Sequence, residues 1–265
     1  MSALVPAAEL PTAVATIVVS AGVGVVYSYV GYRISQRPVS AESRLASAQF
    51  ALWWIGLGAS VAITATDVSL ATLNLYPFPL AVTIGLVSII VDCAFLWGLT
   101  GFLIYVYTGR YHLVELSVFY AAFYVTALYW ILSQDPSSVA YQAGGPAVQY
   151  SATPALALTL VVLVGLVAPE IVGAVLYLSL LRRTTDRSTR FRIILVGGGI
   201  LLWFAIDAFL PSSTSAWVLA KGLLDLVPGI MSLVAFFPPV WVRTRFGVTA
   251  PEIEGTDRVE APGPT

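Results

Sequence analysis

The chain has 265 residues, of which 58% are hydrophobic and only 10% are charged. Soluble domains carry about 25% charged residues, so this composition excludes an ordinary water-soluble protein and requires most side chains to face lipid or other helices. The net charge of −1 gives no reason to expect nucleic-acid binding, and a single cysteine and a single histidine leave little material for a disulfide or metal site. We therefore expect an all-α membrane protein and predict no metal or cofactor.

Seven apolar stretches are long enough to cross the roughly 30 Å hydrocarbon core of a bilayer as helices. They predict a seven-transmembrane helix bundle over residues 1–246, with helices near 12–33, 46–67, 78–109, 113–133, 154–182, 192–210 and 215–242. No basic segment precedes the first stretch, and its apolar length exceeds that of a signal-peptide core. We therefore expect the first stretch to be a retained helix.

The arginines predict the orientation of the bundle. The loops after the first, third and fifth predicted helices, and the segment after the seventh, carry Arg33, Arg37, Arg44, Arg110, Arg182, Arg183, Arg187, Arg190, Arg192, Arg243 and Arg245. The loops after the second, fourth and sixth helices carry no lysine or arginine. By the positive-inside rule, this asymmetry predicts an N-terminus outside and a C-terminus in the cytoplasm. The predicted location is a prokaryotic cell (plasma) membrane, spanned several times.

Two segments outside the predicted helices have a composition of their own. The loop 134–153 is rich in proline, glycine and serine and is expected to form an irregular cap over the outer face. Residues 247–265 combine acidic side chains with prolines. That combination predicts a disordered acidic tail without a catalytic or signalling domain.

Four acids, Asp92, Glu170, Asp207 and Asp225, lie within the apolar stretches. Each costs at least about 2.5–3.5 kcal/mol on insertion scales unless it is paired or hydrated, so such acids mark candidate functional sites. Counted at about 1.5 Å per residue from the nearest inner arginine, Asp92 and Asp225 lie about 27 Å above the inner boundary. Asp207 and Glu170 lie at about 22 Å and 18 Å by the same count. The acids therefore concentrate in the predicted outer half.

Each acid shares a helical face with small or polar residues, a pattern typical of helix–helix contacts in membranes. We predict a ligand or ion pocket, reached from outside, that is lined by Ser88, Asp92, Glu170, Trp203, Asp207, Lys221 and Asp225. The alternative interpretation is that the acids make interhelical hydrogen bonds and bind no ligand.

Lys221, the only lysine in the chain, lies near the predicted outer rim and four residues before Asp225. It can pair with Asp225 along one helix, or it can extend to the outer headgroups. We favour pairing. Pro228 follows Asp225 by about one turn and Pro169 directly precedes Glu170, so both acids are predicted to lie beside helix kinks.

The seven helices, the outside N-terminus and a lysine in the last helix resemble microbial rhodopsins. That resemblance implies a retinal bound to Lys221 and a ring-packing role for Trp203. It covers the topology and little motif: in that family the lysine lies mid-helix and an aspartate precedes it by four residues, whereas here Asp225 follows Lys221. The bundle is also similar in architecture to the seven-helix sensor modules fused to bacterial and archaeal histidine kinases.

Four functions are compatible with these features, and we favour a receptor or sensor that binds a small molecule or proton from outside. Such a receptor needs a separate cytoplasmic or membrane signalling partner. The second is a proton or cation transporter or channel that uses the acids as a relay. The others are a retinal protein and an intramembrane enzyme acting on a lipid or isoprenoid through paired carboxylates. The sequence favours a protein that is not an enzyme, because it contains no Ser–His constellation.

Overall fold

The computed structural model describes residues 4–37, 40–142, 145–209 and 214–248, without the side chains of Glu170, Asp207, Ala208 and Ser215. Seven helices in these ranges are long and apolar enough to cross a membrane, in agreement with the predicted number of spans. Which end faces the cytoplasm stays a prediction. The predicted acidic tail lies outside the described residues from residue 249 onward.

The helices follow one another with short connections. In chain order the elements are η1 (Ala7–Glu9), α1 (Leu10–Ser35), α2 (Arg44–Thr72), α3 (Phe78–Thr108), α4 (Leu113–Leu132), β1 (Pro136–Gln142), β2 (Gly145–Tyr150), α5 (Leu156–Ser179), η2 (Leu180–Arg182), α6 (Arg187–Phe209), α7 (Ser215–Leu224), α8 (Leu226–Phe236) and α9 (Val240–Phe246). The elements η1 and η2 are single 3₁₀ turns that extend α1 and α5.

The sixth span begins at Arg187, five residues before the start predicted from hydropathy. Asp186 caps it, because a carboxylate oxygen of Asp186 accepts a hydrogen bond from the backbone N–H of Thr189 at 2.6 Å. The hydrogen bonds from Thr189 also hold the pKa of Asp186 below its usual range. The predicted start is wrong because polar residues in the first turns hide a helix from a search for apolar stretches.

The last span is also shorter than the single helix predicted over 215–242. It is interrupted at Asp225, which separates α7 from α8, and it ends at Phe236. Pro238 and Pro239 have no backbone N–H to donate to the preceding turn, so the helix cannot continue through them. The chain resumes as the short helix α9, which ends at Phe246 and is followed by Gly247 with a positive φ of 60°.

The loop 134–153 is a β-hairpin and not an irregular cap. β1 pairs with β2 in antiparallel register, with Val139 opposite Val148 and Tyr141 opposite Pro146. At its base the Ser151 hydroxyl donates to an Asp135 carboxylate oxygen at 2.7 Å. Valine and tyrosine alternate with alanine and glutamine in both strands, which favours β-structure, but the prolines and glycines conceal this pattern in the sequence.

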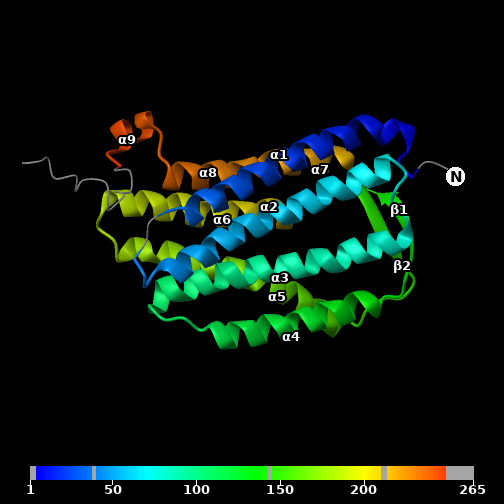
Figure 1. Cartoon of the computed structure of the whole chain (residues 1–265), viewed down its shortest axis with the longest axis horizontal. Helices are drawn as coiled ribbons and strands as arrows, with labels where there is room; N and C mark the ends of the chain where they lie inside the picture. The colour runs from blue at the N-terminus through cyan, green and yellow to red at the C-terminus, as the bar shows by residue number, and fades with distance from the viewer. Residues whose placement is uncertain (1–3, 38–39, 143–144, 210–213, 249–265) are drawn as a thin grey trace, which may run out of the picture.

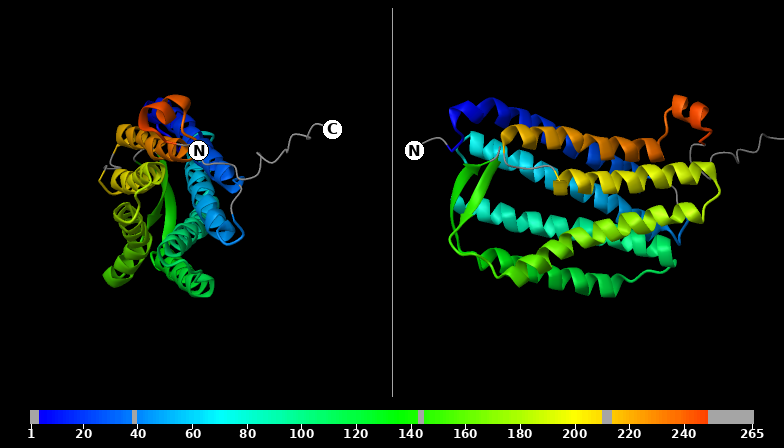
Figure 2. Two further views of the ribbon diagram at one scale, coloured as in Figure 1. Left: turned by 90° about the vertical axis from the view of Figure 1, so that its left-hand side faces the viewer. Right: turned by 180° about the vertical axis from the view of Figure 1, so that it is seen from behind.

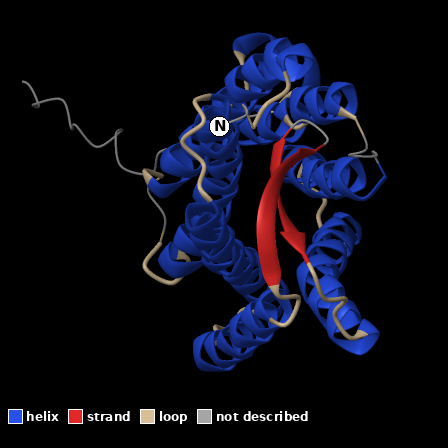
Figure 3. Ribbon diagram, turned by 90° about the vertical axis from the view of Figure 1, so that its right-hand side faces the viewer, coloured by secondary structure: helices blue, strands red, loops and turns tan. Residues whose placement is uncertain are grey.

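The helices run side by side along one long axis (Figure 1). One end, here called the hairpin end, carries the start of α1 and the hairpin, whose strands cross the end of the bundle (Figure 3). The opposite end, here called the arginine end, carries α9 and the connections α1–α2, α3–α4 and α5–α6 (Figures 1 and 2). All arginines of the predicted cytoplasmic segments therefore lie at the arginine end.

Glycines allow α1, α2 and α3 to pack closely. A Cβ on Gly24 of α1 would lie 3.1 Å from the carbonyl oxygen of Gly58 on α2. A Cβ on Gly98 of α3 would lie 2.5 Å from the carbonyl oxygen of Gln49 on α2. Lipid is as apolar as the helix faces, so close van der Waals contact of this kind, and not hydrophobic burial, holds membrane helices together.

An aromatic cluster fills the centre of the bundle toward the arginine end. Phe50, Trp53 and Trp54 of α2 are each at most 2% exposed. The Phe50 ring stacks on Phe102 of α3 at a centroid distance of 4.3 Å and lies 5.7 Å from Phe236 of α8. The cluster therefore joins helices that are distant in the sequence.

Candidate functional site

Asp92 lies on α3 and contacts α2. The Ser60 hydroxyl donates a hydrogen bond to Asp92 Oδ1 at 3.1 Å, and the Asp92 side chain is half-buried. Gly85, two turns nearer the hairpin end, has open space where a Cβ would stand. The face that carries Gly85, Ser88 and Asp92 is therefore packed on α2 at Asp92 and open at Gly85.

Asp225 lies at the interruption of the last span. The Tyr27 hydroxyl of α1 donates a hydrogen bond to the backbone carbonyl oxygen of Asp225 at 2.5 Å. Tyr27 is fully buried, and a Cβ on Gly229 would lie 2.9 Å from its ring. The absence of a side chain at Gly229 thus lets α8 come close enough to α1 for this hydrogen bond.

Pro228 gives a physical reason for the interruption. It cannot donate an N–H to the carbonyl four residues earlier, and its ring crowds the preceding turn. Carbonyl groups in that turn then need other donors, because a bilayer core contains no water to satisfy them. The carbonyl four residues before Pro228 is that of Leu224, and the Tyr27 hydroxyl donates to the next carbonyl along the chain, that of Asp225. The sequence predicts a kink here, but not the tyrosine from α1.

The other predicted site residues lie on different helices. Lys221 on α7 and Ser88 on α3 are half-buried, and Trp203 on α6 packs against the central hydrophobic core. Glu170 lies in α5 and Asp207 in α6, but their side chains are outside the described part of the structure. A single pocket containing all four acids therefore stays a prediction.

The Asp92 side chain and the Asp225 backbone carbonyl both contact the α1–α2 pair, and the depths of the two contacts can be compared. Gly24 and Gly58 mark one level at which the two antiparallel helices touch. Tyr27 lies one turn from Gly24 toward the arginine end, and Ser60 lies two residues from Gly58 toward the hairpin end. At 1.5 Å per residue, the two contacts differ in depth by roughly 7.5 Å.

A double-mutant cycle tests the predicted pairing of Lys221 with Asp225. The structure links these residues through the backbone, since the Asp225 N–H donates to the Lys221 carbonyl at 2.9 Å. If the side chains also interact, Lys221→Ala should lower stability by roughly 1–3 kcal/mol by leaving the acid uncompensated. The double variant with Asp225→Ala should recover part of that loss in detergent melts. Strictly additive losses would show that the two side chains act independently.

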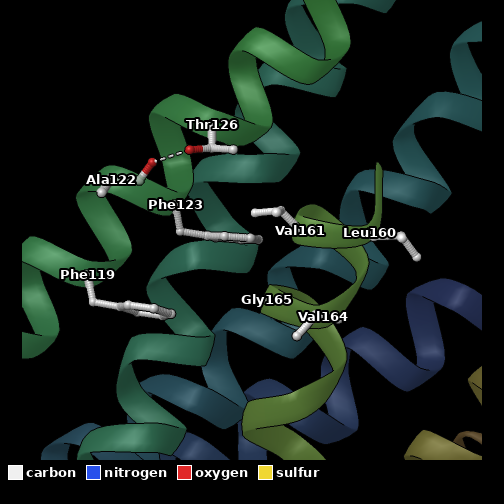
Figure 4. A pocket seen from close by; sticks show the side chains of 8 residues that line it. All are labelled: Phe119, Ala122, Phe123, Thr126, Leu160, Val161, Val164 and Gly165. Atoms are coloured by element: carbon white, nitrogen blue, oxygen red, sulfur yellow. Dashed lines mark hydrogen bonds between the residues drawn. The ribbon is translucent and has the colours of Figure 1, made fainter. Parts of the chain in front are cut away.

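Asp92, Lys221 and Asp225 line none of four cavities that lie within the described part of the chain. One is a groove of about 490 Å³ between α4 and α5, lined by Phe119, Ala122, Phe123, Thr126, Leu160, Val161, Val164 and Gly165. Figure 4 shows these apolar side chains on the two helices, with the Thr126 hydroxyl turned back to the carbonyl of Ala122. The groove therefore offers apolar contact and no acid or base.

A second cavity lies at the arginine end, and sequence reasoning missed it. This arginine-end pocket has a volume of about 230 Å³ and includes Arg37, Phe50, Phe102, Tyr177 and Phe236 in its lining. The Arg37 guanidinium lies over the Phe236 ring, 5.3 Å from its centroid. In the sequence Arg37 is one of many arginines of the positive-inside pattern, and nothing local distinguishes it.

Polar contacts also stabilise the packing of the segments at the hairpin end. The Tyr76 hydroxyl donates to Asp67 Oδ1 at 2.8 Å, and the Leu4 N–H donates to Asn74 Oδ1 at 2.9 Å. Tyr141 of β1 packs on a small apolar cluster formed by α1 and α2. Burial raises the pKa of the Tyr141 phenol, and the nearby Glu9 raises it further. The hairpin thus packs on the bundle through the ring of Tyr141, whose phenol is neutral.

Comparisons with known proteins supply no family for this chain. No protein-family model, curated protein or solved structure matches it. Among the described residues there is also no cluster of three His, Cys, Asp or Glu side chains that could hold a metal ion. The chain is a multi-pass membrane protein by its seven apolar helices, and its function has to be argued from the contacts above.

Proposed function

We propose that this membrane protein is a receptor-like binding module that takes up a small molecule or a proton between the hairpin-end halves of its helices. The bound state is transmitted to the arginine end, where a separate partner detects it. The observation that carries the proposal is the interruption of the last span at Asp225, with the carbonyl there held by Tyr27 of α1.

α8 connects this interruption to the arginine end. It has eleven residues, about 16 Å at 1.5 Å per residue. Its last residue, Phe236, lies beneath Arg37, and Phe237 lies beneath Arg33 with its ring centroid 4.4 Å from the guanidinium carbon. A change of helix direction at Asp225 moves these rings relative to the arginines. A helix that has two packing arrangements is the kind of element that couples two sites.

The arginine end gives less support to transport of cations. A proton or cation transporter needs a polar route through both halves of the bundle. The arginine-end pocket is lined by Arg37 and by no acid, and a fixed positive charge opposes the passage of cations. The intramembrane acids are therefore better explained as a binding and switching site than as one end of a relay.

Hydrogen exchange tests the proposal with the proton as the ligand. We expect Asp225→Asn, which imitates a protonated acid, to change amide exchange both in α8 and at the arginine end, in α9 and residues 180–187. Lowering the pH should produce the same pattern in the wild-type protein, after correction for intrinsic exchange rates. The measurement uses the full chain in lipid nanodiscs and peptide-resolved mass spectrometry.

Asp135→Asn is the control, because Asp135 is an exposed acid at the base of the hairpin. Its effect should stay within the hairpin. If Asp225→Asn changes exchange only within one turn of residue 225, the relay to the arginine end does not exist. Proton flux into liposomes that is lost in Asp225→Asn would instead identify a transporter. A visible absorption band lost on hydroxylamine treatment would instead identify a retinal protein on Lys221.

A further inference from the structure

The arginine-end pocket is formed by residues from five parts of the chain. Arg37 follows α1, Ser47 and Phe50 belong to α2, Phe102 belongs to α3, Tyr177 to α5 and Phe236 to α8. Its volume of about 230 Å³ lies below the roughly 300–1,000 Å³ of pockets for drug-sized ligands. The space therefore suits an ion or a small headgroup and not a large ligand.

Positive charge dominates the pocket. Arg37 is the one charged residue among its described lining residues. Arg192 of α6 is close enough to interact electrostatically with Arg37 and with the lining residue Tyr177. Glu42, the acid of the neighbouring α1–α2 connection, interacts with Tyr105 but is exposed to solvent. The pocket lining thus carries one guanidinium and no acid, with a second guanidinium nearby.

Burial and the charge of Arg192 both act on the Arg37 guanidinium. Partial burial lowers the pKa of Arg37, and the positive charge of Arg192 lowers it further. Arginine nevertheless keeps its charge in proteins. The free-energy cost of burying Arg37 near Arg192 is therefore not relieved by loss of a proton. An anion beside the Arg37 guanidinium offsets this cost through charge-assisted hydrogen bonds.

The remaining walls define which kind of anion fits. Phe50 and Phe102 stack on each other and form an apolar floor, and Phe236 supports the guanidinium of Arg37 from one side. The Ser47 side chain adds a hydroxyl to the lining. A planar guanidinium and a hydroxyl are suited to phosphate oxygens, and the aromatic floor is suited to an apolar portion of the same molecule.

We propose that the arginine-end pocket binds a phosphate-bearing anion, with the Arg37 guanidinium on the phosphate and the aromatic floor against the adjoining atoms. The phosphate can belong to a phospholipid headgroup or to a soluble phosphate. This site stands on the pocket alone and does not depend on the receptor-like function proposed above, because it needs no movement of α8.

Thermal melts of the full chain test this site with two probes. The first is inorganic phosphate added to the protein in a neutral detergent. The second is phosphatidylglycerol, mixed into phosphatidylcholine nanodiscs and compared with phosphatidylcholine alone. We expect at least one probe to raise the Tm by preferential binding to the folded state. A rise with phosphate identifies a soluble ligand, and a rise with phosphatidylglycerol alone identifies a lipid headgroup.

Arg37→Gln should weaken the apparent affinity for the active probe by roughly tenfold or more, because charge-assisted hydrogen bonds are lost. Arg110→Gln is the matched control, since Arg110 is an exposed arginine at the same end and does not line the pocket. Ser47→Leu, which fills the cavity without changing charge, should abolish the rise in Tm even if Arg37→Gln folds poorly. The proposal is overturned if neither probe raises the Tm, if Arg110→Gln weakens the effect equally, or if Ser47→Leu leaves it intact.

Discussion

Phe50→Ala is expected to cause a large loss of stability, roughly 2–4 kcal/mol. Phe50 is 2% exposed, and its ring contacts Phe102, Trp53 and Phe236 at centroid distances of 4.3, 5.4 and 5.7 Å. Truncation leaves a cavity where three helices meet. The expected loss is somewhat below the roughly 3–5 kcal/mol of soluble cores, because lipid removes most of the transfer contribution and leaves the packing contribution.

Phe119→Ala is the control for this variant. Phe119 lies on α4, is 53% exposed and lines the open groove between α4 and α5. Because lipid can replace most of the contacts of its ring, its truncation should cost less than about 1 kcal/mol. Apparent Tm values of both variants in one detergent provide the comparison. Equal losses for the two variants would mean that the aromatic cluster does not form the core.

Gly98→Ala should also destabilise the protein, by roughly 1–3 kcal/mol, although alanine is the better helix former. The added Cβ would lie 2.5 Å from the Gln49 carbonyl oxygen and 3.2 Å from the Trp53 backbone nitrogen. Both atoms belong to the backbone of α2, so neither can move without separating α2 from α3. Thermal melts and size-exclusion profiles of the purified variant would measure the effect.

Gly85→Ala provides the matched control on the same helix. A Cβ at Gly85 meets no atom within 4 Å, so only the change in helix propensity remains. We expect this variant to be neutral or more stable by roughly 0.5–1 kcal/mol. If Gly98→Ala melts at the same temperature as Gly85→Ala, the close contact between α2 and α3 described above is wrong.

Much of the architecture could be predicted from the sequence. The seven spans follow from apolar stretches, because transfer of a helix into lipid depends on the composition of that stretch alone. The boundaries fail where other interactions decide them. Asp186 starts α6 among polar residues, and the prolines after Phe236 end α8 earlier than hydropathy predicts. The sequence predicts an irregular loop where the structure has a hairpin, because prolines and glycines conceal the alternation in its two short strands.

The candidate site was likewise predictable in part from the sequence and in part only from the structure. The sequence by itself singled out the intramembrane acids, since each is costly in lipid wherever its helix packs. It also predicted a kink near Asp225 from Pro228. Only the tertiary structure decided that the hydroxyl of Tyr27 on α1 donates to the Asp225 carbonyl. The donor lies 198 residues away in the chain, and no local pattern connects the two.

Gly85 and Gly98 of α3, together with the arginine-end pocket, show why the sequence alone does not predict tertiary contacts. In the sequence both positions are simply glycines of one apolar helix. In the structure a Cβ at Gly85 would stand in open space, whereas a Cβ at Gly98 would meet the backbone of α2. Arg37 likewise reads as one arginine among many until α2, α3, α5 and α8 converge on it. Hydropathy and charge are properties of a segment and survive any packing. Contacts and cavities are properties of several segments together, so they exist only once the helices have packed.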